Sequence, residues 1–280
     1  QKVEQKPSES ILALRGINAS YGNTKVLNQV DIEVPKGCTV AVVGESGSGK
    51  STAARVITGL LPPTNGVVIF DGDDLPKSLE NRSKDQKRRI QMIYQMADTA
   101  MNPRQTVREI IGRPIEFYLG VTGRENSERV VRLLEMIELN ADFMDRLPSE
   151  LSGGQKQRIC IARALAAEPD FIICDEVTSA LDQIVQEGIL KLLMDLQKEL
   201  GLTYLFITHD ISTVKAIADQ VVVMNEGLVI EQGQKSEVFK PPHPPYTELL
   251  LSSVPEMDPN WLDNLNQKRE KSLKSSHNSV

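Results

Sequence analysis

The sequence is poor in cysteine and has no long apolar run. Its three cysteines, Cys38, Cys160 and Cys174, are scattered without C-x-x-C spacing, so they predict neither a disulfide framework nor a zinc or iron–sulfur site. A reducing cytoplasm fits this usage best. No run approaches the roughly 20 apolar residues of a transmembrane helix, and the first residues, QKVEQKPSES, lack the apolar core of a signal peptide. We expect any membrane role to depend on partner proteins.

The sequence also lacks an excess of basic charge. The chain carries 32 Lys and Arg against 38 Asp and Glu, a net charge of -6. This balance argues against a general nucleic-acid surface, because such binding relies on Lys and Arg that neutralise phosphates. The one basic cluster, Lys268 to Lys274, falls in a polar segment that we interpret as a solvated end. The chain begins at Gln1 without Met, which predicts a piece of a longer protein, such as the second half of a tandem, with residues 1–10 as linker.

Short apolar runs alternate with helical patterns along the 280 residues, which is typical of an α/β domain. The expected strands lie at 11–17, 30–34, 38–44, 67–72, 171–175 and 203–210, followed by a hairpin at 221–233 whose turn is assigned to Asn225, Glu226 and Gly227.

Helical periodicity dominates between about Asp98 and Ala167. There, one face of a helix is predicted to carry Val130, Leu133, Leu134 and Ile137. Another helix is expected from Gln183 to a stop at Gly201. Its predicted core residues are Val185, Ile189, Leu193, Leu196 and Leu200.

A glycine-rich segment follows the expected strand at 38–44 and precedes a helical run. Its residues, Gly44-Glu45-Ser46-Gly47-Ser48-Gly49-Lys50-Ser51, fit the phosphate-loop pattern G-x-x-x-x-G-K-[ST]. Glycines let the backbone turn its N–H groups toward phosphate oxygens, and the positive end of the next helix adds to the attraction. Lys50 would bring a charge to the β- and γ-phosphates, and Ser51 a hydroxyl ligand for Mg²⁺. We expect these residues and Thr52 to bind ATP.

A second signal lies where the apolar strand FIICD ends in two carboxylates. Asp175 is placed to hold Mg²⁺, directly or through water, as the acidic partner of the phosphate loop. Glu176 is placed to accept a proton from the attacking water. Cys174, just before them, is expected to be a buried small thiol without a chemical role.

Between these two motifs lies Leu151-Ser152-Gly153-Gly154-Gln155. This segment resembles the signature sequence of ATP-binding-cassette proteins. Ser152 and the glycines start the helical run QKQRICIARALA, and a helix N-terminus attracts anions. In the family, the signature serves the γ-phosphate of ATP that a second subunit binds. The resemblance therefore implies two cassettes that close head to tail around two ATP molecules.

The resemblance covers about residues 11–255 and implies further roles. Tyr21 resembles the aromatic residue that stacks on adenine, and Gln95 resembles the glutamine that links Mg²⁺ and the attacking water to the membrane subunit. Ser179-Ala180-Leu181-Asp182 resembles the loop through which the two sites communicate, and His209 resembles the switch histidine at the γ-phosphate. The implied catalytic residues are Lys50, Gln95, Glu176 and His209. The implied Mg²⁺ ligands are Ser51, Gln95 and Asp175.

Several stretches are similar to the dipeptide, oligopeptide and nickel importer branch, namely MNPRQTVREII, ELSGGQKQR and PPYTELLLSSVP. In that branch the tail usually reads His-Pro-Tyr-Thr. Here Pro244 precedes Pro245-Tyr246-Thr247, with His243 one position early, so the resemblance implies nothing firm about the contacts of this tail. Some peptide importers hold an iron–sulfur cluster through cysteines near this tail. No cysteine follows Cys174, so we predict no such cluster.

The resemblance thus implies an ATPase that energises an importer of di- or oligopeptides or similar small solutes, at the cytoplasmic face of the inner membrane. Its implied partners are a second nucleotide-binding domain (identical, different or fused), two permease subunits and, indirectly, an extracytoplasmic solute-binding protein. A rival is a soluble, non-transport cassette ATPase, such as a component of a carbon–phosphorus lyase complex, which keeps the same motifs. Cassette proteins of translation or DNA repair fit less well, because the sequence shows neither a second cassette nor a long coiled coil.

The expected fold is α/β, with a P-loop NTPase core, an antiparallel β subdomain and an inserted helical subdomain. Residues 11–240 are expected to form the nucleotide-binding domain, with the helical subdomain at about 98–167. Residues 241–280 are expected to form a C-terminal extension. In it, a Pro-rich turn leads to a short helix through Leu249, and the polar end begins at Asn264.

Overall fold

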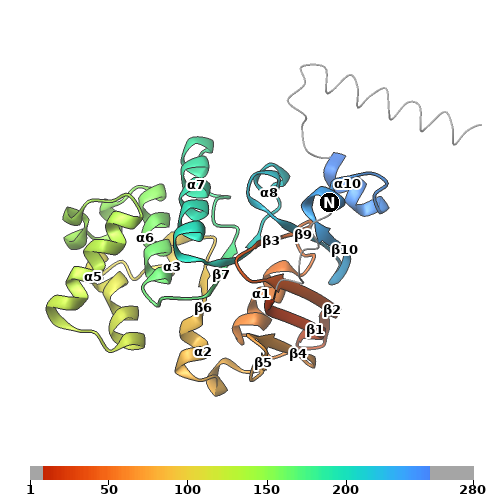
Figure 1. The fold of residues 1–280 in the computed structure, drawn as a ribbon, viewed down its shortest axis with the longest axis horizontal. Coiled ribbons are helices and arrows are strands. Elements are labelled where there is room, and N and C mark those ends of the chain that lie inside the picture. Colours follow the sequence, from red (N-terminus) through yellow and green to blue (C-terminus); the bar gives the residue numbers. More distant parts are fainter. Residues whose placement is uncertain (1–8, 253–280) are drawn as a thin grey trace, which may run out of the picture.

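The computed structural model describes residues 9–252. Most of the expected linker, the polar end from Asn264 and the basic cluster at Lys268 to Lys274 lie outside these residues. Helices α3, α5 and α6 gather at one end of the molecule, strands β1, β2 and β4 lie at the other, and β3, β7 and β9 lie between them (Figure 1). Across the described chain, no helix combines the length and apolarity that spanning a membrane requires.

Within residues 9–252, the larger sheet has six strands in the order β10-β9-β3-β8-β7-β6. Neighbouring strands are parallel, apart from the antiparallel hairpin of β9 and β10. The strands are β3 (Thr39–Val43), β6 (Ile90–Ile93), β7 (Phe171–Asp175), β8 (Thr203–Ile207), β9 (Gln220–Asn225) and β10 (Leu228–Gln234).

The central strands are apolar throughout because both faces of this sheet are covered. Successive side chains of a strand point to opposite faces. Accordingly, Ile172 and Phe206 join the core that contains the helices of the 97–165 region. Ile173 and Leu205 join a second core, which contains helix α1 and the smaller sheet.

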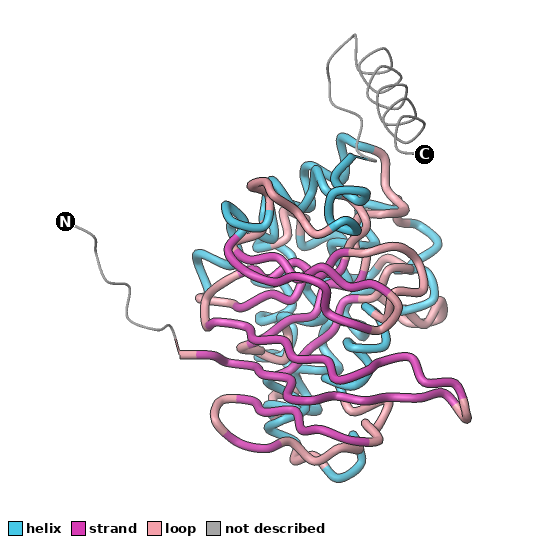
Figure 2. Tube along the Cα trace, turned by 90° about the vertical axis from the view of Figure 1, so that its right-hand side faces the viewer, coloured by secondary structure: helices cyan, strands magenta, loops and turns pink. Residues whose placement is uncertain are grey.

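The smaller sheet of the described chain is antiparallel, with the order β2-β1-β4-β5. Its strands are β1 (Ser10–Tyr21), β2 (Thr24–Pro35), β4 (Asn65–Phe70) and β5 (Asp73–Asp74). The paired strands β1 and β2 run across the molecule and close in a turn at its edge (Figure 2). Both are longer than the apolar runs predicted, because their outer ends carry exposed polar residues.

Helices fill the chain between β6 and β7. They are α3 (Ala97–Ala100), α4 (Val107–Pro114), α5 (Gly123–Met136) and α6 (Gly153–Leu165). Short turns of other helix types are η1 (Leu79–Asn81), η2 (Ile115–Leu119), η3 (Ala141–Asp145) and η4 (Pro148–Glu150). The remaining helices are α1 (Lys50–Thr58), α2 (Lys84–Arg89), α7 (Gln183–Leu200), α8 (Ile211–Ile217), α9 (Lys235–Val238) and α10 (Pro245–Ser252).

Three details differ from the sequence predictions. Leu200 was expected in the core, but it is 44% exposed, because α7 ends there and Gly201 turns the chain away. Asn225 is the last residue of β9, so Glu226 and Gly227 alone make the hairpin turn, both at positive φ. Strand β6 was not predicted, since its four residues are too short a run to stand out.

Candidate nucleotide-binding site

The glycine-rich segment forms a loop between β3 and α1. Gly44 has a φ of 152°, and a Cβ there would lie 2.1 Å from the carbonyl oxygen of Met224. Gly49, at φ 105°, is the N-cap of α1 and offers no side chain to the first helical N–H groups. These N–H groups, together with the positive end of the helix, suit a phosphate.

The Lys50 ammonium lies inside this loop. Its Nζ donates hydrogen bonds to the carbonyl oxygens of Gly44 and Glu45, both at 2.8 Å, and to the Ser48 hydroxyl at 3.3 Å. Burial lowers the pKa of Lys50, while the charges of Glu176 and Asp175 act in the opposite direction. The loop thus holds a positive charge at its centre.

Ser51 and Asp175 meet across the carboxyl edge of the sheet. The Ser51 hydroxyl donates a hydrogen bond to Oδ1 of Asp175 at 3.1 Å. Burial raises the pKa of Asp175, and the neighbouring charge of Glu176 adds to this; the Ser51 hydrogen bond and the charges of Lys50 and Arg55 lower it. Two oxygens this close form a donor set of the kind that hard cations such as Mg²⁺ prefer.

Glu176 is the centre of a polar cluster built from separate segments. Nε2 of Gln95 donates to Oε2 of Glu176 at 2.9 Å and to the Ser179 hydroxyl at 3.1 Å. Nδ1 of His209 lies 3.3 Å from the other carboxylate oxygen, Oε1. The structure therefore brings Gln95, Glu176, His209 and Ser179 together, although sequence reasoning had placed Ser179 in a different group.

The backbone of Glu176 is itself unusual. Its φ is 49°, in the left-handed region that side-chain-bearing residues rarely adopt. Its N–H donates to the Ile207 carbonyl at 2.9 Å, and its own carbonyl accepts from the N–H and the hydroxyl of Ser179 at 3.1 and 3.0 Å. Such strain persists where surrounding bonds hold it, and it clusters at functional sites.

The segment Leu151–Gln155 starts α6. Ser152 caps this helix: its hydroxyl accepts from the N–H of Gln155 at 3.3 Å, and the Gln155 side chain accepts from the N–H of Ser152 at 2.9 Å. Helix α6 packs in the core that contains the helices of the 97–165 region, whereas α1 packs in the core that contains the smaller sheet. Within one chain, the phosphate loop and the signature segment therefore lead into helices that cover opposite faces of the larger sheet.

The segment Ser179–Asp182 leads into α7. Asp182 is the N-cap, and its carboxylate accepts from the N–H of Val185 at 3.1 Å. A Cβ at Gly153 would lie 3.7 Å from Cδ2 of Leu181. The structure therefore brings this segment next to the signature segment of the same chain.

Tyr21 ends β1 beside α1. Nη1 of Arg55 donates to the Tyr21 hydroxyl at 3.1 Å, and the guanidinium lies 6.0 Å from the ring centre. The ring remains 42% exposed, so a flat base could stack on it. Sequence reasoning missed Arg55, for which the only signal was its place one helical turn after Ser51.

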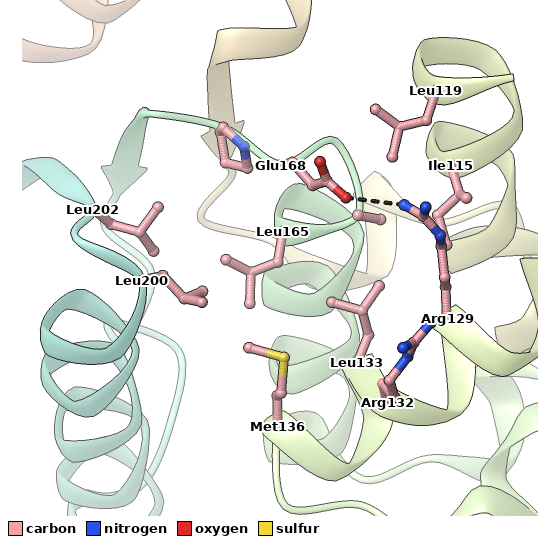
Figure 3. Close-up of a pocket in the computed structure, with 12 residues that line it drawn as sticks. Ile115, Leu119, Arg129, Arg132, Leu133, Met136, Leu165, Glu168, Leu200 and Leu202 are labelled. Carbon is pink, nitrogen blue, oxygen red and sulfur yellow. Dashed lines mark hydrogen bonds and ion pairs between the residues drawn. The ribbon is translucent and has the colours of Figure 1, made fainter. Parts of the chain in front are cut away.

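A separate groove of about 460 Å³ opens between α5, α6 and the end of α7. Figure 3 shows its apolar walls, with Leu165, Leu200 and Met136, and the ion pair of Arg129 with Glu168 at 2.9 Å. Its lining includes none of the predicted site residues, so the groove does not belong to the nucleotide site.

The fold and the site define a P-loop ATPase with a cassette signature, and comparisons with known proteins agree. The ABC transporter family model matches residues 27–179, and the model of the oligopeptide/dipeptide transporter C-terminal region matches 230–278. This chain therefore belongs to the ABC transporter family, as an ATPase of its dipeptide and oligopeptide branch, which confirms the predicted resemblance.

Relatives of known name support the same placement. The chain is 42% identical to the dipeptide transport ATP-binding protein DppF of Haemophilus influenzae, covering 88% of this chain and 75% of that protein. It is 42% identical to the oligopeptide transport ATP-binding protein OppF of Bacillus subtilis, covering 91% and 85%.

Solved structures confirm the predicted α/β fold with its antiparallel and helical parts. Cassette cbiO1 of Clostridium perfringens, part of the transporter complex cbiONQ, superposes with a TM-score of 0.75 at 32% identity, covering 83% of this chain and 91% of cbiO1. A dimeric post-hydrolysis form of the cassette MJ0796, bound to ADP and phosphate, gives 0.70 at 31% identity, covering 80% and 98%.

Proposed function

We propose that this chain hydrolyses ATP, with the residues assembled above, to drive peptide import through a membrane permease. The observation that carries the proposal is the cluster around Glu176, placed beside Ser51 and Asp175 in a chain whose C-terminal region matches peptide transporters. The same match favours the importer over the soluble carbon–phosphorus lyase type of cassette. Residues 11–240 act as the nucleotide-binding domain, with a helical subdomain at 98–167, and residues 241–280 as its extension.

The proposed chemistry follows from the contacts. Tyr21 stacks on adenine, and the loop from Gly44 to Thr52 surrounds the phosphates. Lys50 turns its charge from the loop carbonyls to the γ-phosphoryl group, where His209 adds a second polar contact. Glu176 accepts the proton of the attacking water, which Gln95 orients.

Ser51 and Asp175 would supply oxygen ligands for Mg²⁺. Nε2 of Gln95 donates to Glu176, so the side-chain carbonyl oxygen of Gln95 is the atom that would serve as a further ligand. When bound, Mg²⁺ neutralises charge on the phosphate oxygens.

The proposed partners are a second cassette, two permease subunits and, through them, an extracytoplasmic binding protein, with this chain at the cytoplasmic face of the membrane. A groove supports a contact with a permease, and most of its lining comes from residues 100–118, which follow Gln95 in the sequence. It is lined by Met101, Ile110 and Phe117, among others, and Phe117 is 58% exposed. Met101 and Ile110 are buried in its floor, so Phe117 is the exposed apolar side chain that we assign to the permease contact.

The test is affinity capture of the chain from detergent-solubilised native membranes, with mass spectrometry of the proteins that accompany it. We expect two multi-spanning permeases. Phe117→Glu should lose them and keep ATP hydrolysis, while Leu249→Glu, which charges an exposed leucine on α10, should keep them. Recovery of soluble enzymes alone would contradict the transport role and favour the lyase-type alternative.

A further inference from the structure

The C-terminal helix α10 reaches the phosphate loop through the side chain of Tyr246. The Tyr246 hydroxyl oxygen accepts a hydrogen bond from the backbone N–H of Glu45, 3.0 Å away and 201 positions earlier in the chain. Glu45 is the second residue of the phosphate-loop motif. The contact therefore joins the C-terminal region, matched at 230–278, to the loop that the proposed function assigns to ATP.

Helix α10 is a firm support for this hydroxyl. The buried Thr247 donates from Oγ1 to Oε2 of Glu231 on β10 at 2.8 Å. The Tyr246 ring and Leu250 pack in a core cluster with Val43, the last residue of β3 before the loop. The ring is thus held by both the helix and the core.

Besides the Tyr246 contact, backbone bonds hold the loop at Ser48: its N–H donates to the Glu45 carbonyl at 3.2 Å, and its carbonyl accepts from the N–H of Gly227 at 3.0 Å. Gly44, Gly47 and Gly49 all have positive φ, and glycines leave the backbone many alternative conformations. Two carbonyl oxygens of the loop are held by Lys50, at Gly44 and Glu45. In the proposed function Lys50 exchanges these contacts for phosphate when ATP binds. The bond from Glu45 to Tyr246 does not involve Lys50, so it can persist in both states.

We propose that Tyr246 is a positioning residue for ATP binding: its hydroxyl holds the Glu45 amide and so preorganises the phosphate loop. A loop that is ordered before its ligand arrives loses less conformational entropy on binding. The C-terminal region of this chain thereby raises the ATP affinity of its own cassette. The inference rests on the proposed function, and Tyr246 acts through Glu45 rather than by touching ATP.

The test compares Tyr246→Phe with the wild-type full-length chain. The substitution keeps the ring and removes the acceptor. Since Glu45 is exposed, water replaces the lost partner, and the effect is limited to the net value of one hydrogen bond. We expect Kd and KM for ATP to rise by about 2- to 10-fold, with kcat at saturating ATP unchanged and Tm lowered by no more than about 4 °C, the value of one hydrogen bond in a domain of this size. In the absence of nucleotide, hydrogen exchange at the Glu45 amide should be faster in Tyr246→Phe than in the wild type.

Tyr204→Phe is the matched control, because it removes the same atom from a buried tyrosine whose hydroxyl has no hydrogen-bond partner within residues 9–252. It should bind ATP as the wild type does. Unchanged Kd and KM in Tyr246→Phe would overturn the inference, and so would a rise in KM accompanied by a lower kcat and a fall in Tm of more than about 4 °C, which shows general loosening of the fold. A wild-type chain that fails to bind ATP would overturn the proposed function as well.

Discussion

At the scale of single residues, the site concentrates charge where an apolar strand ends. Asp175 and Glu176 are adjacent, and the pKa of Asp175 is raised by burial first and by Glu176 second. A folded-state pKa above the ordinary 3.8 means that the folded chain holds this proton more firmly than the unfolded chain. Protonated Asp175 therefore stabilises the fold at low pH, and this contribution to the unfolding free energy is lost as the pH rises from 3.8 through the higher folded-state pKa. At neutral pH the ionised carboxylate destabilises the nucleotide-free fold.

This sign leads to a prediction for Asp175→Asn. At neutral pH, the nucleotide-free variant should melt at the same temperature as the wild type or higher, because the costly buried charge is gone. The rise in Tm on adding Mg²⁺ and ATP should shrink, because a charged ligand is lost. Differential scanning fluorimetry measures both values, with Asp73→Asn, at an exposed carboxylate, as control. A lower Tm without nucleotide, or full stabilisation by Mg²⁺ and ATP, would contradict the assignment.

Glu176→Gln tests the proposed base. The amide keeps the size of the side chain and a hydrogen-bonding oxygen, so ATP should still bind. Turnover should fall by ~100-fold or more, as expected for a lost general base. Steady-state ATPase assays and ATP titrations check the two parts, and Glu187→Gln on the exposed side of α7 serves as control. Near-normal turnover would refute the role of Glu176.

At the scale of elements, the glycines of the signature segment have a packing role besides any contact with ATP. A Cβ on Gly154 would lie 2.6 Å from Cγ1 of Val185, so the start of α6 approaches α7 more closely than an alanine allows. At Gly153 the nearest atom would be Cδ2 of Leu181, at an ordinary 3.7 Å. The two neighbouring glycines are thus under different constraints.

Gly154→Ala should therefore destabilise the fold by about 1–3 kcal/mol through overpacking, while Gly153→Ala should change the unfolding free energy little. Adding Val185→Ala removes the clashing methyl group, so the double variant should lose less than the sum of the single losses, by about 1 kcal/mol. Urea unfolding of the single and double variants measures these differences. Additive losses would show that α6 and α7 do not interfere at this point.

At the scale of the whole molecule, the phosphate loop and the signature segment belong to elements on opposite faces of one sheet. In the proposed function, one chain would therefore offer two different half-sites, and a head-to-tail pair of chains would complete two ATP sites. Helices α1 and α6, which lie well apart in Figure 1, would each contribute a helix N-terminus to a different ATP site of that pair.

The pairing can be tested in the hydrolysis-deficient Glu176→Gln background. With ATP and Mg²⁺ the chain should dimerise, and Ser152→Arg should abolish dimerisation without loss of ATP binding, because the arginine adds bulk at the interface. Size-exclusion chromatography with light scattering reports the mass, and Arg124→Glu, on a side chain 93% exposed on α5, is the control. A Ser152→Arg chain that still dimerises would place the interface elsewhere.

Local patterns determined much of this molecule. The runs that became β3, β7 and β8 and the periodicity of α5 predicted the α/β fold, because burial on both faces or along one stripe leaves its mark in consecutive residues. The same logic failed at Leu200, where the helical period continues although the helix ends and its last leucine faces a groove.

The sequence by itself also determined the phosphate loop and the signature, because both are built from neighbouring residues that form one continuous stretch of backbone at the start of a helix. Only the tertiary structure decided which distant side chains meet. Gln95, Glu176 and His209 converge because parallel strands end at a common edge. Tyr246 reaches Glu45 because α10 packs against β10 and shares a core cluster with the end of β3. Hydrogen bonds across such separations depend on the path of the folded chain, which no local pattern records.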